Sequence, residues 1–210
     1  MTGNIRNGSM KDVIYQQIND SIHNGNYTAG SIINEKSLIK EFAVSKSPVR
    51  EALLELCYDG VLRSIPRYGY EVVRLTREDE KNTREFRIAL ESGSLDLYWD
   101  RISSQDIEAL LKKLQEDKTE DITPLEQWRN NVQFHLGLNF CLRNEFSYRK
   151  LEEALQIQTR AYNQFYMDQW HRDPDFSTQK DHEQILKCIL NGYKEQTLAL
   201  LKQDILHDPV

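Results

Sequence analysis

EFAVSKSPVREAL, residues 41–53, holds the strongest local structural signal in this chain. Ser47 can cap a helix by accepting a backbone N–H of its first turn. Pro48 then stands at the first helical position, where its missing N–H costs nothing. Apolar residues follow at helical spacing, at Val49, Ala52, Leu53 and Leu56. The pattern predicts a tight turn followed by a helix with one buried face.

The same segment leaves three polar side chains at or near the exposed start of the predicted helix. They are Lys46, Ser47 and Arg50. A recognition helix presents its DNA-contacting side chains at its N-terminal end. The segment therefore favours a helix-turn-helix whose second helix enters the major groove.

The sequence before this segment predicts two further helices. A first helix begins at about Lys11 and ends at Asn24-Gly25, a pair that commonly stops helices. Asn34 caps a short second helix that leads into the turn. Residues 1–10 are polar, and we expect them to form a disordered tail.

The sequence after this segment predicts a β-hairpin. Asp59-Gly60 ends the third helix, and two β-like runs follow at residues 61–65 and 70–74. Residues 66–69 join the two runs as a turn. Three helices and a hairpin form a winged helix-turn-helix, which we place at residues 11–75.

Positively charged side chains lie at places that face one side of a winged helix. Lys36 starts the second helix, Lys46 and Arg50 start the third, and Arg67 lies at the hairpin tip. Convergent cations from separate elements are what a phosphate-binding surface requires. Each has a plainer role when taken alone, such as a surface salt bridge for Arg50. The prediction of a DNA-binding face therefore depends on the combination.

The charge of the chain is distributed unevenly. The net charge is −6, but residues 1–77 carry +2 and residues 78–210 carry −8. A slightly basic N-terminal part beside an acidic remainder suits contact with phosphates through one part only. No apolar run approaches the roughly 20 residues of a membrane span. The three cysteines are widely spread and fit core residues in a reducing compartment, so we expect a cytoplasmic protein without membrane contact.

Residues 76–210 show only helical periodicity. Six helices are predicted, with polar loops at residues 117–123 and 171–178. Ser104 caps the second helix, and the other five begin at Thr76, Pro124, about Tyr148, about Gln179 and about Lys194. Helices of this number and amphipathic character form a bundle. The predicted fold is therefore mainly α, with a winged helix-turn-helix before an all-α, six-helix domain for ligand binding and dimerisation.

Residues 11–75 resemble the GntR family of bacterial transcription regulators. The run SPVREAL at residues 47–53 and the segments 59–62 and 66–69 carry the resemblance. By motif it implies DNA contacts from Lys36, Ser45, Lys46, Ser47, Arg50, Arg67, Tyr68 and Gly69. Lys36 and Lys46 stand where the family usually has Arg. A Lys ammonium is a point donor without the bidentate geometry that reads guanine, so base contact would fall mainly to Arg50.

Residues 76–210 resemble the FCD ligand-binding domain of FadR-type regulators, in its six-helix VanR-like branch. Arg87 with Glu91, Phe134-His135 and Asp181-His182 carry the resemblance. It implies a sequence-specific regulator, expected to be a repressor, that a small organic acid controls. Arg87 either meets the carboxylate of this effector or pairs with Glu91 one helical turn away.

The two resemblances together imply a homodimer on double-stranded DNA. Two recognition helices of a two-fold dimer meet two half-sites of an inverted-repeat operator. Arg87, His135 and His182 are the residues that we expect to bind the effector.

The FCD resemblance also implies a divalent metal site, since the family often holds an ion with one Asp and three His. At those positions this chain has Asn131, His135, His182 and Asp204, and His207 is a further candidate. Zn²⁺, Ni²⁺ and Mn²⁺ would all suit such ligands. The alternative is a metal-free pocket in which the two histidines are ordinary buried residues and the effector binds directly.

Two other classes of function fit parts of the sequence. A helical metal-dependent hydrolase with an accessory winged helix would use His135, His182 and Asp204 to activate water. No motif for a general base or a nucleophile accompanies these residues, so we expect no enzyme. The winged helix would also lack a purpose in such an enzyme. A winged helix used only for protein contacts is the other alternative.

Overall fold

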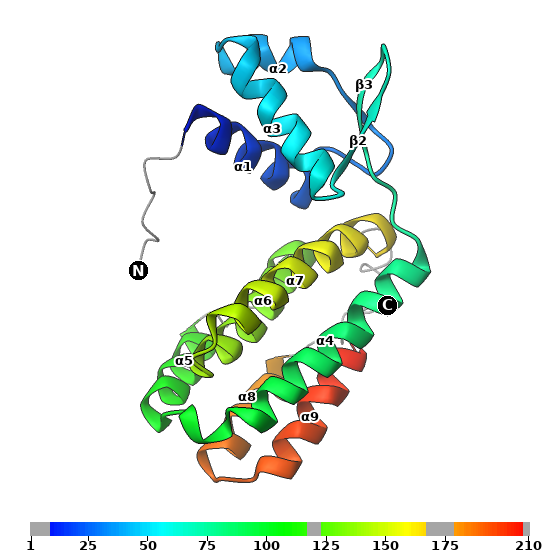
Figure 1. The fold of residues 1–210 in the computed structure, drawn as a ribbon. Helices are drawn as coiled ribbons and strands as arrows, with labels where there is room; N and C mark the ends of the chain where they lie inside the picture. The colour runs from blue at the N-terminus through cyan, green and yellow to red at the C-terminus, as the bar shows by residue number, and fades with distance from the viewer. Residues whose placement is uncertain (1–8, 117–122, 167–178, 208–210) are drawn as a thin grey trace. The chain divides into compact units, whose positions relative to one another are not determined.

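Residues 9–116, 123–166 and 179–207 are described by the computed structural model of this protein. The chain divides into two units, residues 1–75 and 76–210 (Figure 1). Each unit has its own hydrophobic core. Residues 1–8 of the predicted tail and most of the two predicted loops lie outside the described residues. Within the described part the predicted fold class is confirmed, because helices dominate and the sheet belongs to the N-terminal unit.

Three helices pack together in the N-terminal unit: α1 (Met10–His23), α2 (Glu35–Phe42) and α3 (Lys46–Tyr58). Their shared core includes Ile14, Ile18, Ile22, Leu38, Val49, Ala52, Leu53 and Leu56. The apolar stripe predicted for the third helix is therefore confirmed. Ser9 and Asp12 form a capping box at the start of α1, so the predicted tail extends too far by Ser9 and Met10.

The start of α3 differs from its prediction by two residues. Ser45 rather than Ser47 is the N-cap, and its side chain makes no cap hydrogen bond. The hydroxyl of Ser47 instead donates to Glu51 over 2.8 Å. Pro48 therefore stands at the third helical position, which is still among the N–H groups without an intrahelical partner. Its missing N–H costs nothing there, so the motif tolerates either start.

The wing is a three-stranded antiparallel sheet in the order β1-β3-β2. β2 (Leu62–Ile65) and β3 (Gly69–Val72) form the predicted hairpin, and β1 (Ile32–Ile33) pairs with the other edge of β3. The sequence did not predict β1, because two residues are too few for an alternating pattern. Gly69 permits this third strand, since a Cβ at that position would lie 2.5 Å from the Ile33 carbonyl oxygen.

The C-terminal unit contains six α-helices in its described residues, as predicted. They are α4 (Arg77–Leu97), α5 (Ser104–Glu116), α6 (Pro124–Cys141), α7 (Glu145–Phe165), α8 (Gln179–Leu190) and α9 (Lys194–His207), with a 3-10 turn η1 (Trp99–Arg101) after α4. Helix α4 packs against α7 and α9, and α5 packs against α6 and α8 (Figure 1). None of the described helices is long and apolar enough to cross a membrane.

One N-cap and one helix start in this unit were predicted too late. Ser103, not Ser104, accepts the first-turn N–H that caps α5. Helix α7 begins at Glu145 rather than near Tyr148, because Asn144 accepts hydrogen bonds from two backbone N–H groups. Polar residues that flank a helix therefore set its start ahead of its first apolar position.

We predict that Gly69→Ala destabilises the N-terminal unit, because the added Cβ meets the Ile33 carbonyl and φ is held at 135°. We expect a loss of about 3 kcal/mol in the free energy of unfolding, measured by urea titration with circular dichroism. Gly25→Ala is the matched control, since φ is 76° but nothing lies within 4 Å of the new Cβ. It should cost only about 1 to 2 kcal/mol. Equal losses for both variants would contradict a role for the contact with β1.

Candidate functional site

The predicted DNA-contacting residues come from three elements of the N-terminal unit. Seven of the eight are exposed, and Gly69 is half-buried. Lys36 lies in the first turn of α2. The start of α3 carries Ser45, Lys46, Ser47 and Arg50, and the turn of the wing carries Arg67 and Tyr68. The exposure of these side chains leaves them available to a partner, while Gly69 has the structural role described above.

The first turn of α3 is open to a negatively charged partner. The Ser45 side chain makes no cap hydrogen bond, so the backbone N–H groups of this first turn lack that side-chain acceptor. Lys46 lies 3.4 Å from Glu35 but keeps 65% of its side chain exposed. An exposed ion pair of this kind contributes little and is readily exchanged for a phosphate. Together with the positive end of the helix dipole, this arrangement can bind a phosphate group.

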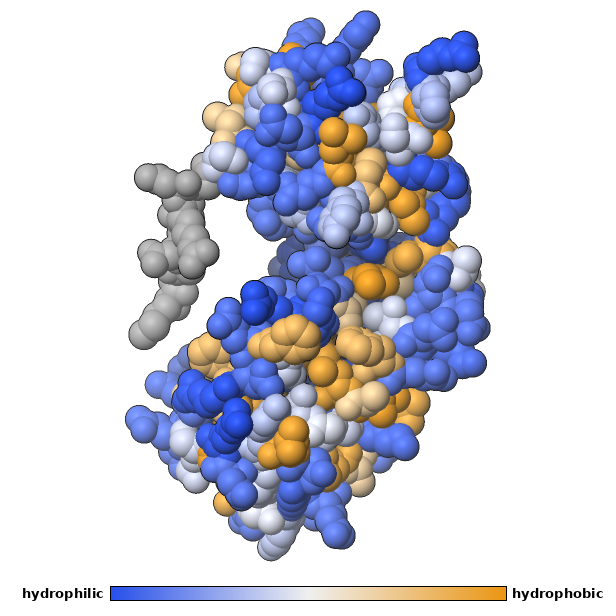
Figure 2. Space-filling view, in the orientation of Figure 1, coloured by the Kyte–Doolittle hydropathy of each residue, from blue (hydrophilic) through white to orange (hydrophobic). Residues whose placement is uncertain are grey.

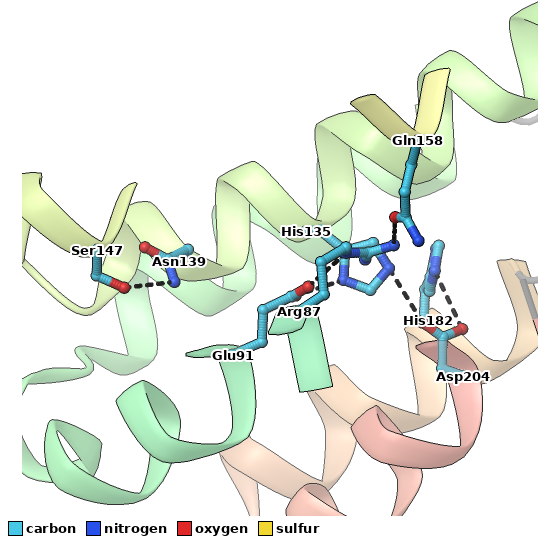
Figure 3. A network of polar contacts seen from close by, with 8 residues as sticks. All are labelled: Arg87, Glu91, His135, Asn139, Ser147, Gln158, His182 and Asp204. Carbon is cyan, nitrogen blue, oxygen red and sulfur yellow. Dashed lines mark hydrogen bonds and ion pairs between the residues drawn. The ribbon is translucent and has the colours of Figure 1, made fainter. Parts of the chain in front are cut away.

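A second group of polar residues lies in the core of the C-terminal unit (Figure 3). His135 of α6, His182 of α8 and Asp204 of α9 are at most 2% exposed, and their ligand atoms lie within 4.8 Å of one another. Nε2 of His135 is 3.2 Å from one carboxylate oxygen of Asp204, and Nε2 of His182 is 3.3 Å from the other. The structure thus brings three predicted ligands together. Asn131 is buried one turn before His135 on α6, whereas His207 is exposed.

Glu91 of α4 contacts His135 from the side opposite Asp204. One Glu91 oxygen lies 2.7 Å from Nδ1 of His135, and the other accepts a 2.8 Å hydrogen bond from Nε of Arg87. Arg87 also donates to Gln158 of α7 over 2.5 Å and is completely buried. Of the two roles weighed for Arg87, the structure contains the pair with Glu91.

Gln158 was not predicted to belong to this site. It lies 71 residues from Arg87 along the chain, so no local spacing connects the two. The sequence does carry one signal, because Gln158 is a polar residue within an otherwise apolar stripe of α7 formed by Leu151, Leu155 and Tyr162. A polar residue on a buried helix face generally has a specific partner.

Burial and neighbouring charges act in opposite directions on the pKa values in this site. Burial lowers the pKa of His135, but the carboxylates of Glu91 and Asp204 outweigh it and raise the pKa to about 9. Burial raises the pKa of Asp204, yet the imidazoles of His135 and His182 hold it well below its usual value. Burial also raises the pKa of Glu91, and Arg87 and His135 keep it low. Without a metal ion, a protonated His135 therefore lies between two carboxylates.

The inward-facing atoms of the three residues fit a divalent cation. Nε2 of His135, Nε2 of His182 and both carboxylate oxygens of Asp204 face one another as ion pairs, but none of them makes a well-aligned hydrogen bond among the described residues. Their nitrogen–oxygen distances of 3.2 and 3.3 Å are close to the roughly 3.0 to 3.4 Å between neighbouring ligands of an ion bound at about 2.1 Å. Two imidazoles and one carboxylate are a suitable ligand set for Zn²⁺ and related ions.

A winged helix whose recognition helix starts with exposed cations, joined to a helical bundle with a buried polar site, defines a ligand-responsive DNA-binding regulator. Residues 10–72 match the gntR family of bacterial regulatory proteins, and residues 82–207 match the FCD domain. The chain belongs to the GntR family of transcriptional regulators and has an FCD domain. The predicted family and class are thereby confirmed, and neither the hydrolase nor the winged helix used only for protein contacts is supported.

Known relatives match parts of the chain. The uncharacterized HTH-type transcriptional regulator YdhC of Bacillus subtilis is 36% identical over 127 residues, which are 58% of this chain and 55% of YdhC. The gluconate operon transcriptional repressor of the same species is 36% identical over 93 residues, 44% of this chain and 36% of the repressor. The chain thus spans about half, or less, of the length of these relatives. The E. coli McbR/YncC structure shares the fold, with a TM-score of 0.72 at 18% identity over 95% of this chain and 94% of that one.

We predict that chelator-treated protein loses stability as the pH rises from 6.5 through 9. His135 has a pKa of about 9 when folded and about 6.5 when unfolded. Stabilisation by its proton is therefore complete below pH 6.5 and is lost as the pH passes 9, at most about 3 kcal/mol. Urea titrations followed by tryptophan fluorescence report on this unit, because all three tryptophans lie beyond residue 75. The His135→Gln variant should show a flatter profile, and identical profiles would contradict the prediction.

Proposed function

We propose that this protein binds an inverted-repeat DNA operator as a homodimer and releases it in response to a small organic acid. The start of α3 would enter the major groove, and the wing would contact the backbone. The observation that supports this most directly is the exposed set Lys46, Ser47 and Arg50 around a helix start without a side-chain cap. Arg50 can reach a base edge, while Lys46 and the hydroxyl of Ser47 suit phosphate oxygens.

Dimerisation would bring two such helices to two half-sites. The C-terminal unit carries large exposed apolar side chains, including Phe86, Leu97, Phe140, Phe146 and Tyr193. In Figure 2 apolar surface gathers on the visible face of this unit. Contiguous exposed apolar surface marks interaction sites in soluble proteins. We assign the dimer contact to this unit for that reason.

The buried group in the bundle would be the sensing site. His135, His182 and Asp204 would hold a Zn²⁺, Ni²⁺ or Mn²⁺ ion, with Asn131 or water completing the coordination. When bound, the ion would supply Lewis acidity, so that an anionic oxygen of the effector could coordinate it. The convergence of these buried donor atoms, which lack well-aligned hydrogen bonds among the described residues, supports this assignment.

Control of DNA affinity would pass through α4. Thr76 caps this helix directly after the N-terminal unit ends, and Glu91 of the same helix contacts the ligand His135. An effector that binds one arrangement of the bundle more tightly shifts the population toward it. Residues 75–79 are the segment through which such a shift would reach the DNA-binding unit, and the coupling would work equally in the reverse direction.

We predict that Arg50→Ala and Lys46→Ala weaken operator binding while the protein stays folded. The probe is a duplex that the wild-type protein selects from a random pool, titrated at several salt concentrations. Arg50→Ala should cost about 1 to 3 kcal/mol and relax sequence preference, and Lys46→Ala should lower the salt slope by about 1. Lys112→Ala removes a cation that is 76% exposed on the C-terminal unit and serves as control. Unchanged affinity and salt slope in both test variants would contradict the proposed DNA-binding face.

We predict that the purified protein binds about one equivalent of a divalent transition metal. Elemental analysis after incubation with Zn²⁺ and desalting should find the ion in the wild type. His135→Ala and Asp204→Ala should each lose it, because either change removes one of only three strong ligands. His207→Ala is the matched control at an exposed histidine and should retain the ion. Retention of zinc by the His135→Ala variant would contradict the site.

A further inference from the structure

The pair of Arg87 and Glu91 lies directly behind the proposed ligand His135 (Figure 3). We infer that Glu91 and Arg87 are positioning residues that orient His135 for metal binding and do not contact the effector themselves. This inference rests on the proposed metal site. The contacts that support it join α4 to α6 and α7 and form only in the packed bundle.

Glu91 fixes which nitrogen of His135 faces the site. Its carboxylate lies 2.7 Å from Nδ1, so Nδ1 carries the proton in the pair and Nε2 is left to face Asp204 at 3.2 Å. An imidazole without this partner can rotate or adopt the other tautomer. A carboxylate behind a ligating histidine also makes the ring a stronger donor. Glu91 would therefore increase both the fraction of correctly oriented His135 and the strength of its bond to the ion.

Arg87 fixes Glu91 in turn. Its Nε donates to the second Glu91 oxygen over 2.8 Å, and its Nη1 donates to Gln158 of α7 over 2.5 Å. Both Arg87 and Glu91 are buried, at 0% and 3% exposure, so each neutralises the other inside the core. The guanidinium group of Arg87 therefore donates to partners inside the bundle. A carboxylate effector that used Arg87 would first have to displace Glu91 and leave that charge buried without its partner.

Arg87, Glu91 and His135 form a relay of hydrogen bonds that also connects the site to particular helices. Arg87 and Glu91 belong to α4, His135 to α6 and Gln158 to α7. Movement of His135 onto an ion would therefore act on the middle of α4 through one hydrogen bond. This provides a physical route by which occupation of the site reaches the helix that follows the DNA-binding unit.

Metal affinity of the Glu91→Gln variant tests the relay. The amide keeps the volume and one acceptor oxygen but removes the negative charge. We expect its zinc affinity, measured by competition with a chromophoric chelator, to fall roughly 10- to 100-fold. The absorption spectrum of the Co²⁺-loaded protein should also change, because the geometry and donor strength of His135 differ.

Glu80→Gln is the matched control. Glu80 pairs with Arg84 at the same i,i+4 spacing on the same helix, and it is also buried, but it lies three turns away from Glu91. Its zinc affinity and Co²⁺ spectrum should equal those of the wild type. The double variant Arg87→Met with Glu91→Met removes both charges together and leaves no unpaired charge in the core. It should fold and bind zinc as weakly as Glu91→Gln.

The outcomes separate the relay from the metal site itself. A wild-type protein that binds neither Zn²⁺ nor Co²⁺ overturns the proposed site and the relay with it. A wild type that binds both ions, beside a Glu91→Gln variant of equal affinity and spectrum, overturns the relay alone. Equal losses in the Glu80→Gln and Glu91→Gln variants also overturn it, because they would trace the effect to α4 in general.

Discussion

The C-terminal unit depends on the mutual neutralisation of charges that have no access to water. Arg87, Glu91, His135 and Asp204 are all buried, and an isolated ion in such a place would cost several kcal/mol. Each charge is therefore opposed by another within the core. These four residues belong to α4, α6 and α9, and their neighbours Gln158 and His182 belong to α7 and α8, so the charges can be paired only when these helices lie in their correct register. The polar core thus selects one packing of the bundle.

Much of the fold followed from local rules. The SPVREAL segment contains both the apolar spacing that buries Val49 and Leu53 and the polar residues that begin a helix, so α3 was predictable to within two residues. Its start was ambiguous because Ser45 and Ser47 are both good N-cap residues, and Pro48 is harmless at either resulting position. Strand β1 was not predictable, because its two residues are ordered by pairing with β3 and by the absence of a side chain at Gly69.

The candidate site, like the fold, could be predicted from the sequence only in part. The i,i+4 spacing of Arg87 and Glu91 was visible in the sequence, and the pair is present. The convergence of His135, His182 and Asp204 from three helices was accessible only through family resemblance, since long-range packing has no signature in local spacing. The contact of Arg87 with Gln158 was accessible through neither. Roles that depend on such contacts, including the choice between an effector and an internal partner for Arg87, require the packed structure.

The missing side-chain cap of α3 has a consequence for the recognition helix in its free and bound states. A helix whose first N–H groups lack a cap frays more readily at that end, and its amides exchange with solvent sooner. A phosphate oxygen at the same position would accept those N–H groups and complete the turn. The nucleic acid would then supply the cap that the polypeptide omits, so part of the free energy of binding is spent on ordering the segment that contacts the DNA.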